Sequence, residues 1–347
     1  MKVMRGKLKE IAMDILKGLH ASDEEAAIAA EMMVQSDMRG IDTHGVYFLK
    51  LVAERVDAHM VNIPTPLKVV SESETTTLFD GGNGLGQVAA FRAMKTSIQK
   101  ARKFGTGLSL IRNTNNIGCL ACYTTMAAKE GTVGIAMTNG AASVSPWGGA
   151  EAFFGTNPIS MGIPVGSEPP IVLDMANTVV ARGKIRRAQR MKESIPLGWA
   201  LDSLGVPTTD PNAAIKGGTL VPVGGPKGYG LVLMVDILSG MLSGSSYGPA
   251  LKTFHQLEGP TGVGAFLMAI DIEKFMPLSQ FSSLIQEYVK TIKGVKKAKD
   301  VSRIYLPGEI EYEIERQSMA EGVEMTSQVV SDLNQLLEKV KSPLRLS

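Results

Sequence analysis

Apolar residues in the first 65 positions recur with the period of amphipathic helices. Ser22 followed by Glu25 has the form of a capping box, and the apolar positions after it keep a helical spacing up to Gly40. Thr43 is placed to cap a further helix, and two prolines near position 65 end the region, because proline cannot continue a helix. We therefore expect a helical N-terminal unit over residues 1–65.

From residue 66 onward the pattern changes to short β-branched or apolar runs separated by glycine-rich loops. Such runs predict strands, and the helical spacing returns over 87–105, 120–129 and 327–340. The expected strands occupy 68–80 (a pair), 106–113, 132–139, 159–165, 170–176 and 262–271. This mixture predicts an α/β (α+β mixed) fold with a large, partly antiparallel sheet.

The glycine-rich run at residues 81–86 tests the alternative of a Rossmann fold. Its glycines at 82, 84 and 86 follow the spacing G-x-G-x-G, whereas the dinucleotide fingerprint is G-x-G-x-x-G. Moreover, no acidic residue closes a second strand about twenty residues later, where a ribose-binding carboxylate would stand. The sequence therefore predicts a non-Rossmann fold.

Charge and composition limit the kinds of molecule that this protein is expected to bind. Lys and Arg number 36 against 34 Asp and Glu, and 44% of the residues are hydrophobic. A net charge of +2 gives no electrostatic reason to expect nucleic acid or an anionic membrane. No apolar run has the length of a membrane span, and the start of the chain is amphipathic, unlike a signal peptide. We expect a cytoplasmic protein that acts on a small-molecule substrate.

Cys119 and Cys122 have the C-x-x-C spacing of thioredoxin-like redox pairs. A redox pair needs a lowered thiol pKa, and no basic residue stands within several positions of these cysteines. Packing of small residues at a helix start is the favoured interpretation.

Arg39, Asp42 and His44 place a guanidinium, a carboxylate and an imidazole close together at a helix junction. Histidine titrates near neutral pH and a carboxylate can orient its ring, so an acid/base site is one interpretation. The other is a structural junction with a capping Asp and a hydrogen-bonded His. The residues alone do not separate the two.

Later glycine-rich stretches favour close approach of a ligand to the backbone. Glycines at 148, 149 and 155 flank Thr156 and Asn157, and Asp174 supplies a further hydrogen-bonding side chain at a strand end. Lys227 stands in a second glycine-rich loop before a helix, a position suited to phosphate, although the loop lacks the GK[ST] ending of a P-loop. Taken singly, each loop is more often a structural turn.

The order of these stretches carries more information than any one of them. R-G-x-D-x-H-G is followed by R-N-x-N, P-W-G-G, G-T-N-P, D-M-A, V-A-R-G-K-I, G-W-A-L-D, G-G-P-K-G-Y-G-L and P-G-E. Over residues 5 to 340 this series resembles the malate/L-lactate dehydrogenase family of non-Rossmann, NAD(P)-dependent oxidoreductases.

The resemblance implies three structural units and a homodimer with each active site near the subunit interface. The helical unit at 1–65 would pack with the C-terminal helix at 325–341. A central cofactor-binding unit, built on a largely antiparallel central sheet, would comprise 121–229. A discontinuous third unit, for substrate and dimer contacts, would comprise 66–120 and 230–320.

The resemblance also implies roles for individual residues. His44 matches the family's proton donor or acceptor, with Asp42 or Arg39 available to hold its ring. The positions that match cofactor-binding segments are Gly140, Thr156, Asn157, Asp174, Met175, Ala176, Lys227, Pro307, Gly308 and Glu309. No metal is implied.

Three departures from the family pattern affect the substrate end. Asn116 replaces a histidine that some members use in catalysis, and we expect it to contact substrate in that place. Phe48 replaces an arginine that relatives commonly carry as a partner for the substrate carboxylate. In the run Gly264-Ala265-Phe266, relatives often have histidine before the aromatic residue.

The resemblance implies an oxidoreductase that interconverts a 2-oxo acid and a 2-hydroxy acid by hydride transfer, with NAD or NADP as cofactor and His44 as general acid/base. One alternative is a reductase of a cyclic imine or another carbonyl compound. The other is a cofactor-binding protein that has lost turnover, because catalytic-side positions have changed. Retention of His44 favours an enzyme.

Overall fold

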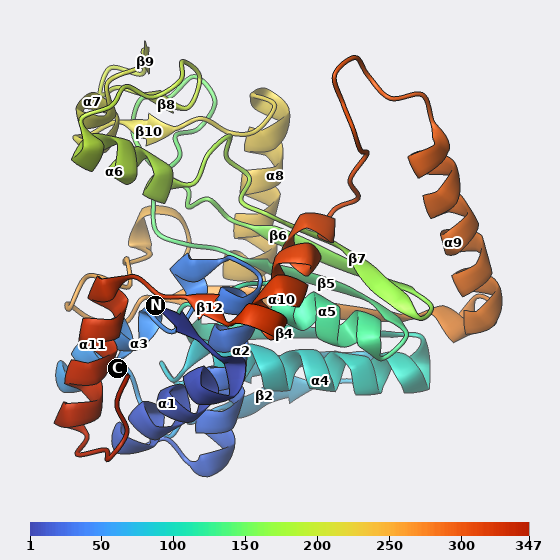
Figure 1. The fold of residues 1–347 in the computed structure, drawn as a ribbon, viewed down its shortest axis with the longest axis horizontal. Coiled ribbons are helices and arrows are strands. Elements are labelled where there is room, and N and C mark those ends of the chain that lie inside the picture. The colour runs from blue at the N-terminus through green and yellow to red at the C-terminus, as the bar shows by residue number, and fades with distance from the viewer. Residues whose placement is uncertain (347) are drawn as a thin grey trace.

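A computed structural model of the chain describes residues 1–346. The N-terminal helices bury the apolar stripes that the sequence pattern predicts and pack against the C-terminal helix α11, close to both chain ends (Figure 1). The two-stranded pairing of β1 with β12 also joins the beginning and the end of the chain. These elements are α1 (Arg5–Gly18), α2 (Asp23–Met38), α3 (Phe48–Asp57), α11 (Ser327–Lys339), β1 (Lys2–Val3) and β12 (Val323–Glu324).

A seven-stranded sheet forms the centre of the molecule, in the order β2-β3-β4-β11-β5-β6-β7. Every neighbouring pair is antiparallel except β3 with β4. The sheet is thus largely antiparallel, as the sequence predicted, and differs from the parallel Rossmann sheet. Its strands are β2 (Lys68–Glu72), β3 (Thr76–Asp80), β4 (Thr106–Thr114), β5 (Thr132–Thr138), β6 (Ile159–Val165), β7 (Glu168–Met175) and β11 (Val263–Asp271).

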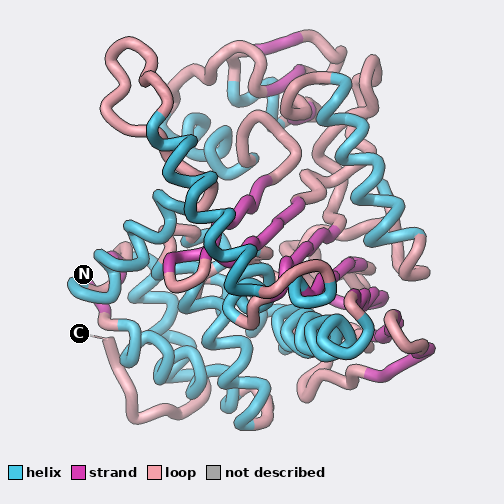
Figure 2. The backbone as a smooth tube through the Cα atoms, turned by 90° about the vertical axis from the view of Figure 1, so that its right-hand side faces the viewer, coloured by secondary structure: helices cyan, strands magenta, loops and turns pink. Residues whose placement is uncertain are grey.

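Helices cover both faces of this sheet, which Figure 2 shows from the side. α4 (Gly86–Phe104) and α5 (Ala121–Lys129) pack on one face, where alternate β11 residues such as Ala265 and Leu267 are fully buried. Because side chains alternate along a strand, Gly264 faces the other way. There it lies against Ser239, which belongs to the π-helical segment Ile237–Met241 that follows α8 (Pro226–Asp236).

A smaller group of elements stands beyond the β6–β7 end, with its own apolar cluster around Val144, Ile185 and Leu220. It contains a three-stranded sheet, and strands from both predicted units, 66–120 with 230–320 and 121–229, share the large sheet. The three-unit division itself stays a prediction. The remaining elements are β8 (Ala200–Leu201), β9 (Pro207–Thr208), β10 (Thr219–Leu220), α6 (Arg182–Met191), α7 (Pro211–Ile215), α9 (Leu278–Gly294) and α10 (Glu309–Glu321).

Three local predictions need correction. Ser22 caps α2 by accepting a hydrogen bond from the Glu25 N–H, but the Glu25 side chain does not close the capping box. Its carboxylate instead accepts from the backbone N–H of Thr65, because it is buried between α2 and that loop. Thr43 caps no helix: it lies inside a 3-10 turn, and α3 begins only at Phe48. Finally, Lys227 belongs to the first turn of α8, not to the loop before it.

Within residues 1–346, no helix combines the length and the apolar character that crossing a membrane requires.

Candidate active site

His44 lies at the end of a 3-10 turn, Asp42–His44, between α2 and α3. Its side chain is partly exposed, yet its Nδ1 atom is inaccessible and has no hydrogen-bond partner among residues 1–346. Burial lowers the pKa of His44 below its ordinary value, and the nearby Asp42 carboxylate opposes this shift. The imidazole is therefore neutral at neutral pH. Neither Asp42 nor Arg39 forms a hydrogen bond with it within the described chain.

Asp37, in the last turn of α2, is a carboxylate beside this turn that sequence reasoning did not single out. It is 5% exposed, and its Oδ2 accepts a hydrogen bond from the backbone N–H of Val46 at 2.8 Å. Burial raises the pKa of Asp37 to about 7, the Val46 N–H opposes that rise, and the Asp42 charge adds to it. The signal that could have found Asp37 is Gly45, whose missing Cβ leaves the room that the carboxylate occupies.

A cavity of about 260 Å³ brings together residues from two distant predicted segments. Asp174 of β7 lines it from one side, and Pro307 and Gly308 line it from the other. Arg39 also lines this cavity, with its buried Nε unpartnered among the described residues and its Nη1 3.5 Å from Glu315. Gly308 has a φ of 84°, and a Cβ there would lie 2.8 Å from the Val172 carbonyl oxygen, so only glycine fits.

The Asp174 side chain is engaged inside the protein. Its Oδ2 accepts hydrogen bonds from the backbone N–H of Ala121 at 2.7 Å and from the thiol of Cys119 at 3.3 Å. Burial raises the pKa of Asp174, and these two donors oppose the rise. The backbone of Asp174, Met175 and Ala176 is what remains for a ligand, since all three residues are partly exposed.

The two cysteines of the C-x-x-C spacing are both buried, free thiols at the start of α5. The neighbouring Cys122 and burial raise the pKa of Cys119 well above its ordinary value. A redox pair would need the opposite shift, which agrees with the packing interpretation.

Glu309 does not line the cavity, although it directly follows Gly308. Its carboxylate accepts hydrogen bonds from Lys293, the Leu306 N–H and Arg303. Burial would raise its pKa, but these donors together lower the pKa of Glu309 to about 2. The side chain thus fixes the loop that leads into α10.

Gly140, Thr156 and Asn157 form a second group, next to the end of β7. The Gly140 N–H donates to Oδ1 of Asn157 at 3.2 Å, and the Asn157 side chain donates to the Val232 carbonyl of α8 at 3.0 Å. Asn177 closes the group, because its N–H donates to the Thr156 carbonyl at 2.9 Å. A Cβ on Gly140 would meet nothing within 4 Å, so its backbone is open to a ligand.

The glycine loop before α8 packs onto the same region. The Val223 N–H donates to the carbonyl of Asn177 at 3.0 Å, and a Cβ on Gly225 would come within 3.2 Å of the Trp147 ring. The P-W-G-G, G-T-N-P, D-M-A and G-G-P-K stretches therefore converge in space. Lys227 is exposed, and no ion pair involves it within the described chain.

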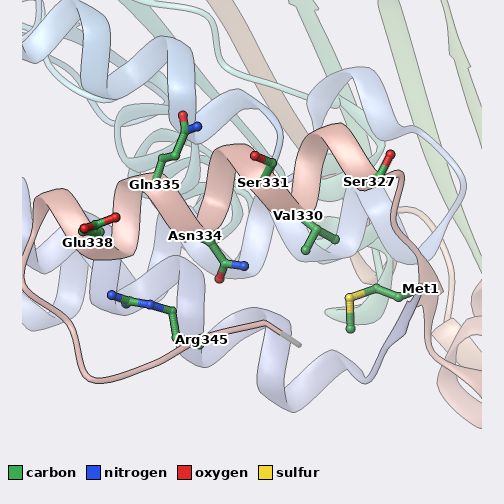
Figure 3. Close-up of a pocket in the computed structure, with 8 residues that line it drawn as sticks. All are labelled: Met1, Ser327, Val330, Ser331, Asn334, Gln335, Glu338 and Arg345. Atoms are coloured by element: carbon green, nitrogen blue, oxygen red, sulfur yellow. The ribbon is translucent and has the colours of Figure 1, made fainter.

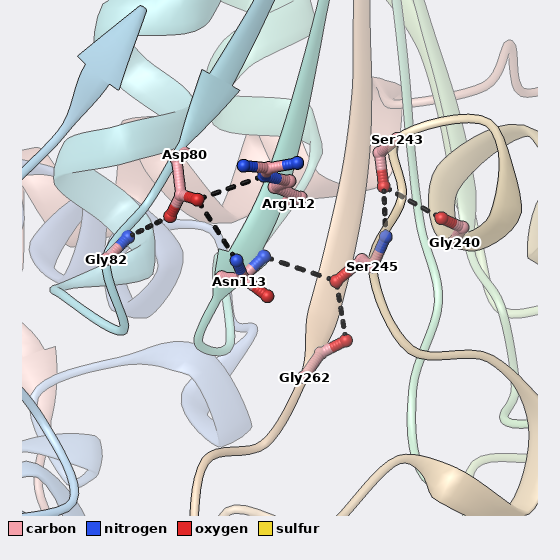
Figure 4. Close-up of polar contacts among 8 residues, drawn as sticks. All are labelled: Asp80, Gly82, Arg112, Asn113, Gly240, Ser243, Ser245 and Gly262. Atoms are coloured by element: carbon pink, nitrogen blue, oxygen red, sulfur yellow. Dashed lines mark hydrogen bonds and ion pairs between the residues drawn. The ribbon is translucent and has the colours of Figure 1, made fainter. Parts of the chain in front are cut away.

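The R-N-x-N stretch begins with structural contacts. Arg112 and Asn113 both donate to Oδ2 of Asp80, and the Asn113 N–H donates to Oγ of Ser245, which ties two strand ends to a distant loop (Figure 4). Asn116, further along, is partly exposed and uses its Oδ1 to accept from the Gly118 N–H at 2.8 Å. Its side-chain N–H₂ group stays available for a ligand.

Phe48 is a core residue in this structure. It is 6% exposed and stacks on Phe254, with ring centroids 4.6 Å apart, while the guanidinium of Arg55 lies 4.9 Å from the Phe254 ring centre. Phe48 therefore adds apolar packing at a position where an arginine, which the family resemblance implies, would add a positive charge.

A second cavity, of about 650 Å³, opens between α11 and the chain ends (Figure 3). None of the residues predicted for the site lines it; its lining residues are Met1, Ser327, Val330, Ser331, Asn334, Gln335, Glu338 and Arg345. We do not assign the active site to this surface.

Comparison with known proteins agrees with the arrangement of these stretches. The malate/L-lactate dehydrogenase family model matches residues 3–334. The chain belongs to the malate/L-lactate dehydrogenase family. It is 38% identical to the malate dehydrogenase of Pyrococcus abyssi, over 98% of this chain and 95% of that protein. The structure of sulfolactate dehydrogenase from Methanocaldococcus jannaschii superimposes with a TM-score of 0.93 at 34% identity, covering 99% and 98% of the two chains.

Membership of this dehydrogenase family confirms the expectation of an oxidoreductase with a nicotinamide cofactor. Family relatives divide between the two forms of that cofactor. One, at 32% identity over 97% of this chain and 95% of its own length, is the ureidoglycolate dehydrogenase (NAD(+)) of Escherichia coli K12. Another, at 31% identity over 93% and 94%, is the (2R)-3-sulfolactate dehydrogenase (NADP(+)) of Chromohalobacter salexigens.

Proposed function

We propose that this protein interconverts a 2-oxo acid and a 2-hydroxy acid by hydride transfer to or from NAD or NADP, with His44 as general acid/base. The observation that carries the proposal is the neutral, partly exposed imidazole of His44 on the turn that leads from the Arg39 cavity to α3. The named relatives, a malate and a sulfolactate dehydrogenase among them, act on 2-hydroxy acids.

The residues of the Arg39 cavity, together with the glycine-rich group beside the end of β7, suit a dinucleotide. In the second group, Gly140 and Gly224 leave open space beside their backbones. In the cavity, Arg39 has a buried Nε, unpartnered among the described residues, that can donate to an anionic or carbonyl oxygen. We assign the holding of the cofactor to Gly140, Thr156, Asn157, Lys227 and the backbone of the runs 174–176 and 307–309. A bound nicotinamide supplies or accepts the hydride.

The protein's own task is to move one proton at the substrate oxygen. In oxidation, neutral His44 accepts the hydroxyl proton, and in reduction the imidazolium returns it to the developing alkoxide. Asp42 is close enough to stabilise the charged ring electrostatically. Asn116 cannot give up a proton at neutral pH, so its N–H₂ group orients the substrate oxygen or carboxylate.

Exchange of His44 tests this assignment. General acid/base catalysis contributes about 10²- to 10⁴-fold, so His44→Ala should lower kcat by that order while the Kd of the cofactor stays nearly unchanged. Asn116→Ala should cost less. The assignment is wrong if His44→Ala retains most of its activity or if Asn116→Ala is the more damaging change.

A substrate screen separates the alternatives. Turnover of a cyclic imine carboxylate in preference to every 2-oxo acid would identify an imine reductase that uses the same residues. Cofactor binding, measured by calorimetry, without hydride exchange with any compound would identify a binding protein that has lost turnover.

We further propose that the chain functions as a homodimer, and α9 supports this. Every residue of this helix is at least partly exposed, and the helix stands away from the body of the molecule (Figure 1). Leu284 and Tyr288 on α9 are 50% and 61% exposed, and Phe275 just before it is 74% exposed. Apolar side chains left open along one helix indicate a protein–protein contact.

Light scattering measures the mass in solution and tests this proposal. The wild type should have twice the chain mass, and Leu284→Asp with Tyr288→Asp should reduce it. A monomeric wild type would contradict the dimer.

A further inference from the structure

The turn that carries His44 needs an anchor, because it is short and has no side-chain cap of its own. Backbone bonds from His44 to Ile41 and from Gly45 to Asp42, each 3.1 Å long, close the turn locally. The Ile41 N–H donates to the Ser36 carbonyl at 2.9 Å and so ties the start of the turn to α2, but not its end, which carries His44. The next helix also begins without a side-chain cap. Across residues 1–346, the carboxylate of Asp37 is the one side chain that hydrogen-bonds to the backbone of residues 40–48.

The chain is shaped for this contact. Asp37 is nearly inaccessible, and a Cβ at Gly45 would overlap its carboxylate, so only glycine directly after His44 leaves the carboxylate in this position. The backbone φ of Gly45 is −82°, which any residue adopts, so the requirement is for space and not for an unusual conformation. The 2.8 Å bond to Val46 therefore joins the end of α2 to the segment two residues beyond the imidazole.

We infer that Asp37 is a positioning residue that holds the His44 imidazole in its partly buried, reactive orientation. Its carboxylate accepts a hydrogen bond from the Val46 N–H and fills the space beside Gly45, and these two contacts fix the turn against α2. The inference rests on the proposed role of His44, because a positioning residue matters to catalysis only if the group it positions does. Asp37 itself touches neither substrate nor cofactor.

Two substitutions of Asp37 separate positioning from general stability. Asp37→Asn keeps an oxygen that accepts the Val46 N–H, whereas Asp37→Ala removes it. Two substitutions of Glu25 are the matched controls, Glu25→Ala for Asp37→Ala and Glu25→Gln for Asp37→Asn: Glu25 is a buried carboxylate at the other end of α2 and accepts a single backbone N–H, from Thr65 at 2.8 Å. A purely structural role would give Asp37→Ala and Glu25→Ala the same behaviour.

The titration of His44, followed through its imidazole proton resonances by NMR, gives a readout that needs no turnover. We expect Asp37→Ala to raise the pKa of His44 toward the ordinary value, because the released ring gains solvent, and to lower kcat by about 10²-fold, a loss typical of a misplaced catalytic group. Asp37→Asn, Glu25→Ala and Glu25→Gln should keep the low pKa of His44 and most of kcat.

An unchanged His44 titration in Asp37→Ala overturns the inference. If Asp37→Ala does not fold, Gly45→Ala displaces the carboxylate instead. This variant should also raise the pKa of His44 and lower kcat. A His44 titration like that of the wild type in Gly45→Ala would equally overturn the inference. Failure of the proposed function looks different. There, His44→Ala would stay active and Asp37→Ala would leave kcat unchanged, although the His44 titration would still move.

Discussion

The carboxylate of Asp174 lies 2.7 Å from the backbone nitrogen of Ala121, and it accepts the N–H of that residue in the first turn of α5. This contact joins the end of β7 to the loop that carries Asn116. Because the negative charge stands at a helix N-terminus, the helix dipole adds to the hydrogen bond. The side chain of Asp174 thus brings two predicted segments together, and only its backbone remains for the cofactor.

Asp174→Ala should therefore lower the free energy of unfolding. It leaves the Ala121 N–H and the Cys119 thiol without their acceptor, and an unsatisfied buried group costs about 1–3 kcal/mol. Asp174→Asn keeps one acceptor oxygen and should cost less. Thermal unfolding measures both variants, with Cys119→Ala as the control for the thiol bond alone. Equal melting temperatures of Asp174→Ala and the wild type would contradict the structural role.

Lys227→Ala should weaken cofactor binding without affecting stability. The lysine is exposed in the first turn of α8, where its charge can reach a phosphate, and a charge-assisted hydrogen bond is worth about 1.5–3 kcal/mol. Titration of NADH and NADPH into each variant measures the loss. Lys216→Ala removes another exposed lysine outside the matched cofactor positions and should bind both cofactors as the wild type does. An unchanged Kd for Lys227→Ala excludes the contact.

The sequence predicted the elements well where one physical signal dominated. Short apolar runs between glycine-rich loops predicted the strands β5 and β6, and Ser22 marked the start of α2. Thr43 misled because its capping propensity is local, whereas the turn at 42–44 is fixed by Asp37 from the preceding helix. Such long-range contacts have no periodic signature in the sequence.

The sequence predicted which segments contribute to the candidate site, but not how their side chains are arranged in space. Arg39 was placed with His44 because the two are five positions apart, yet it lines a cavity with Asp174 and Gly308. Glu309 shared a motif with Gly308 but forms ion pairs with Lys293 and Arg303. Proximity along the chain does not determine which way a side chain points, and tertiary packing decided both cases.

Malate and lactate should be poor substrates, although the Pyrococcus abyssi relative is named a malate dehydrogenase. Phe48 is buried against Phe254 at the position where the family resemblance implies an arginine, so the substrate carboxylate has no bidentate partner from this residue to offset its desolvation cost. The kcat/KM values of malate and lactate, compared with a panel of other 2-hydroxy acids, measure this. If malate turns over as fast as any other compound, another cation binds its carboxylate, and Arg39→Gln would then identify Arg39 in that role.

The pH dependence of turnover should follow the neutral imidazole of His44. Burial lowers its pKa below the ordinary value of 6.5, so the proton-accepting form persists to lower pH than for an exposed histidine. With cofactor saturating, the rate of oxidation should fall as pH is lowered, with an inflection below 6.5. Reduction needs the imidazolium, and its rate should therefore decline as pH rises, with an inflection that also lies below 6.5.

Asp37→Ala should move both inflections to higher pH, because exposure of the His44 ring removes the burial that lowers its pKa. Glu25→Ala, which removes a matched hydrogen bond at the other end of α2, should leave both inflections in place. An inflection of the wild type at or above 6.5 in the oxidation profile would mean that another group takes the proton, or that His44 is solvated during turnover.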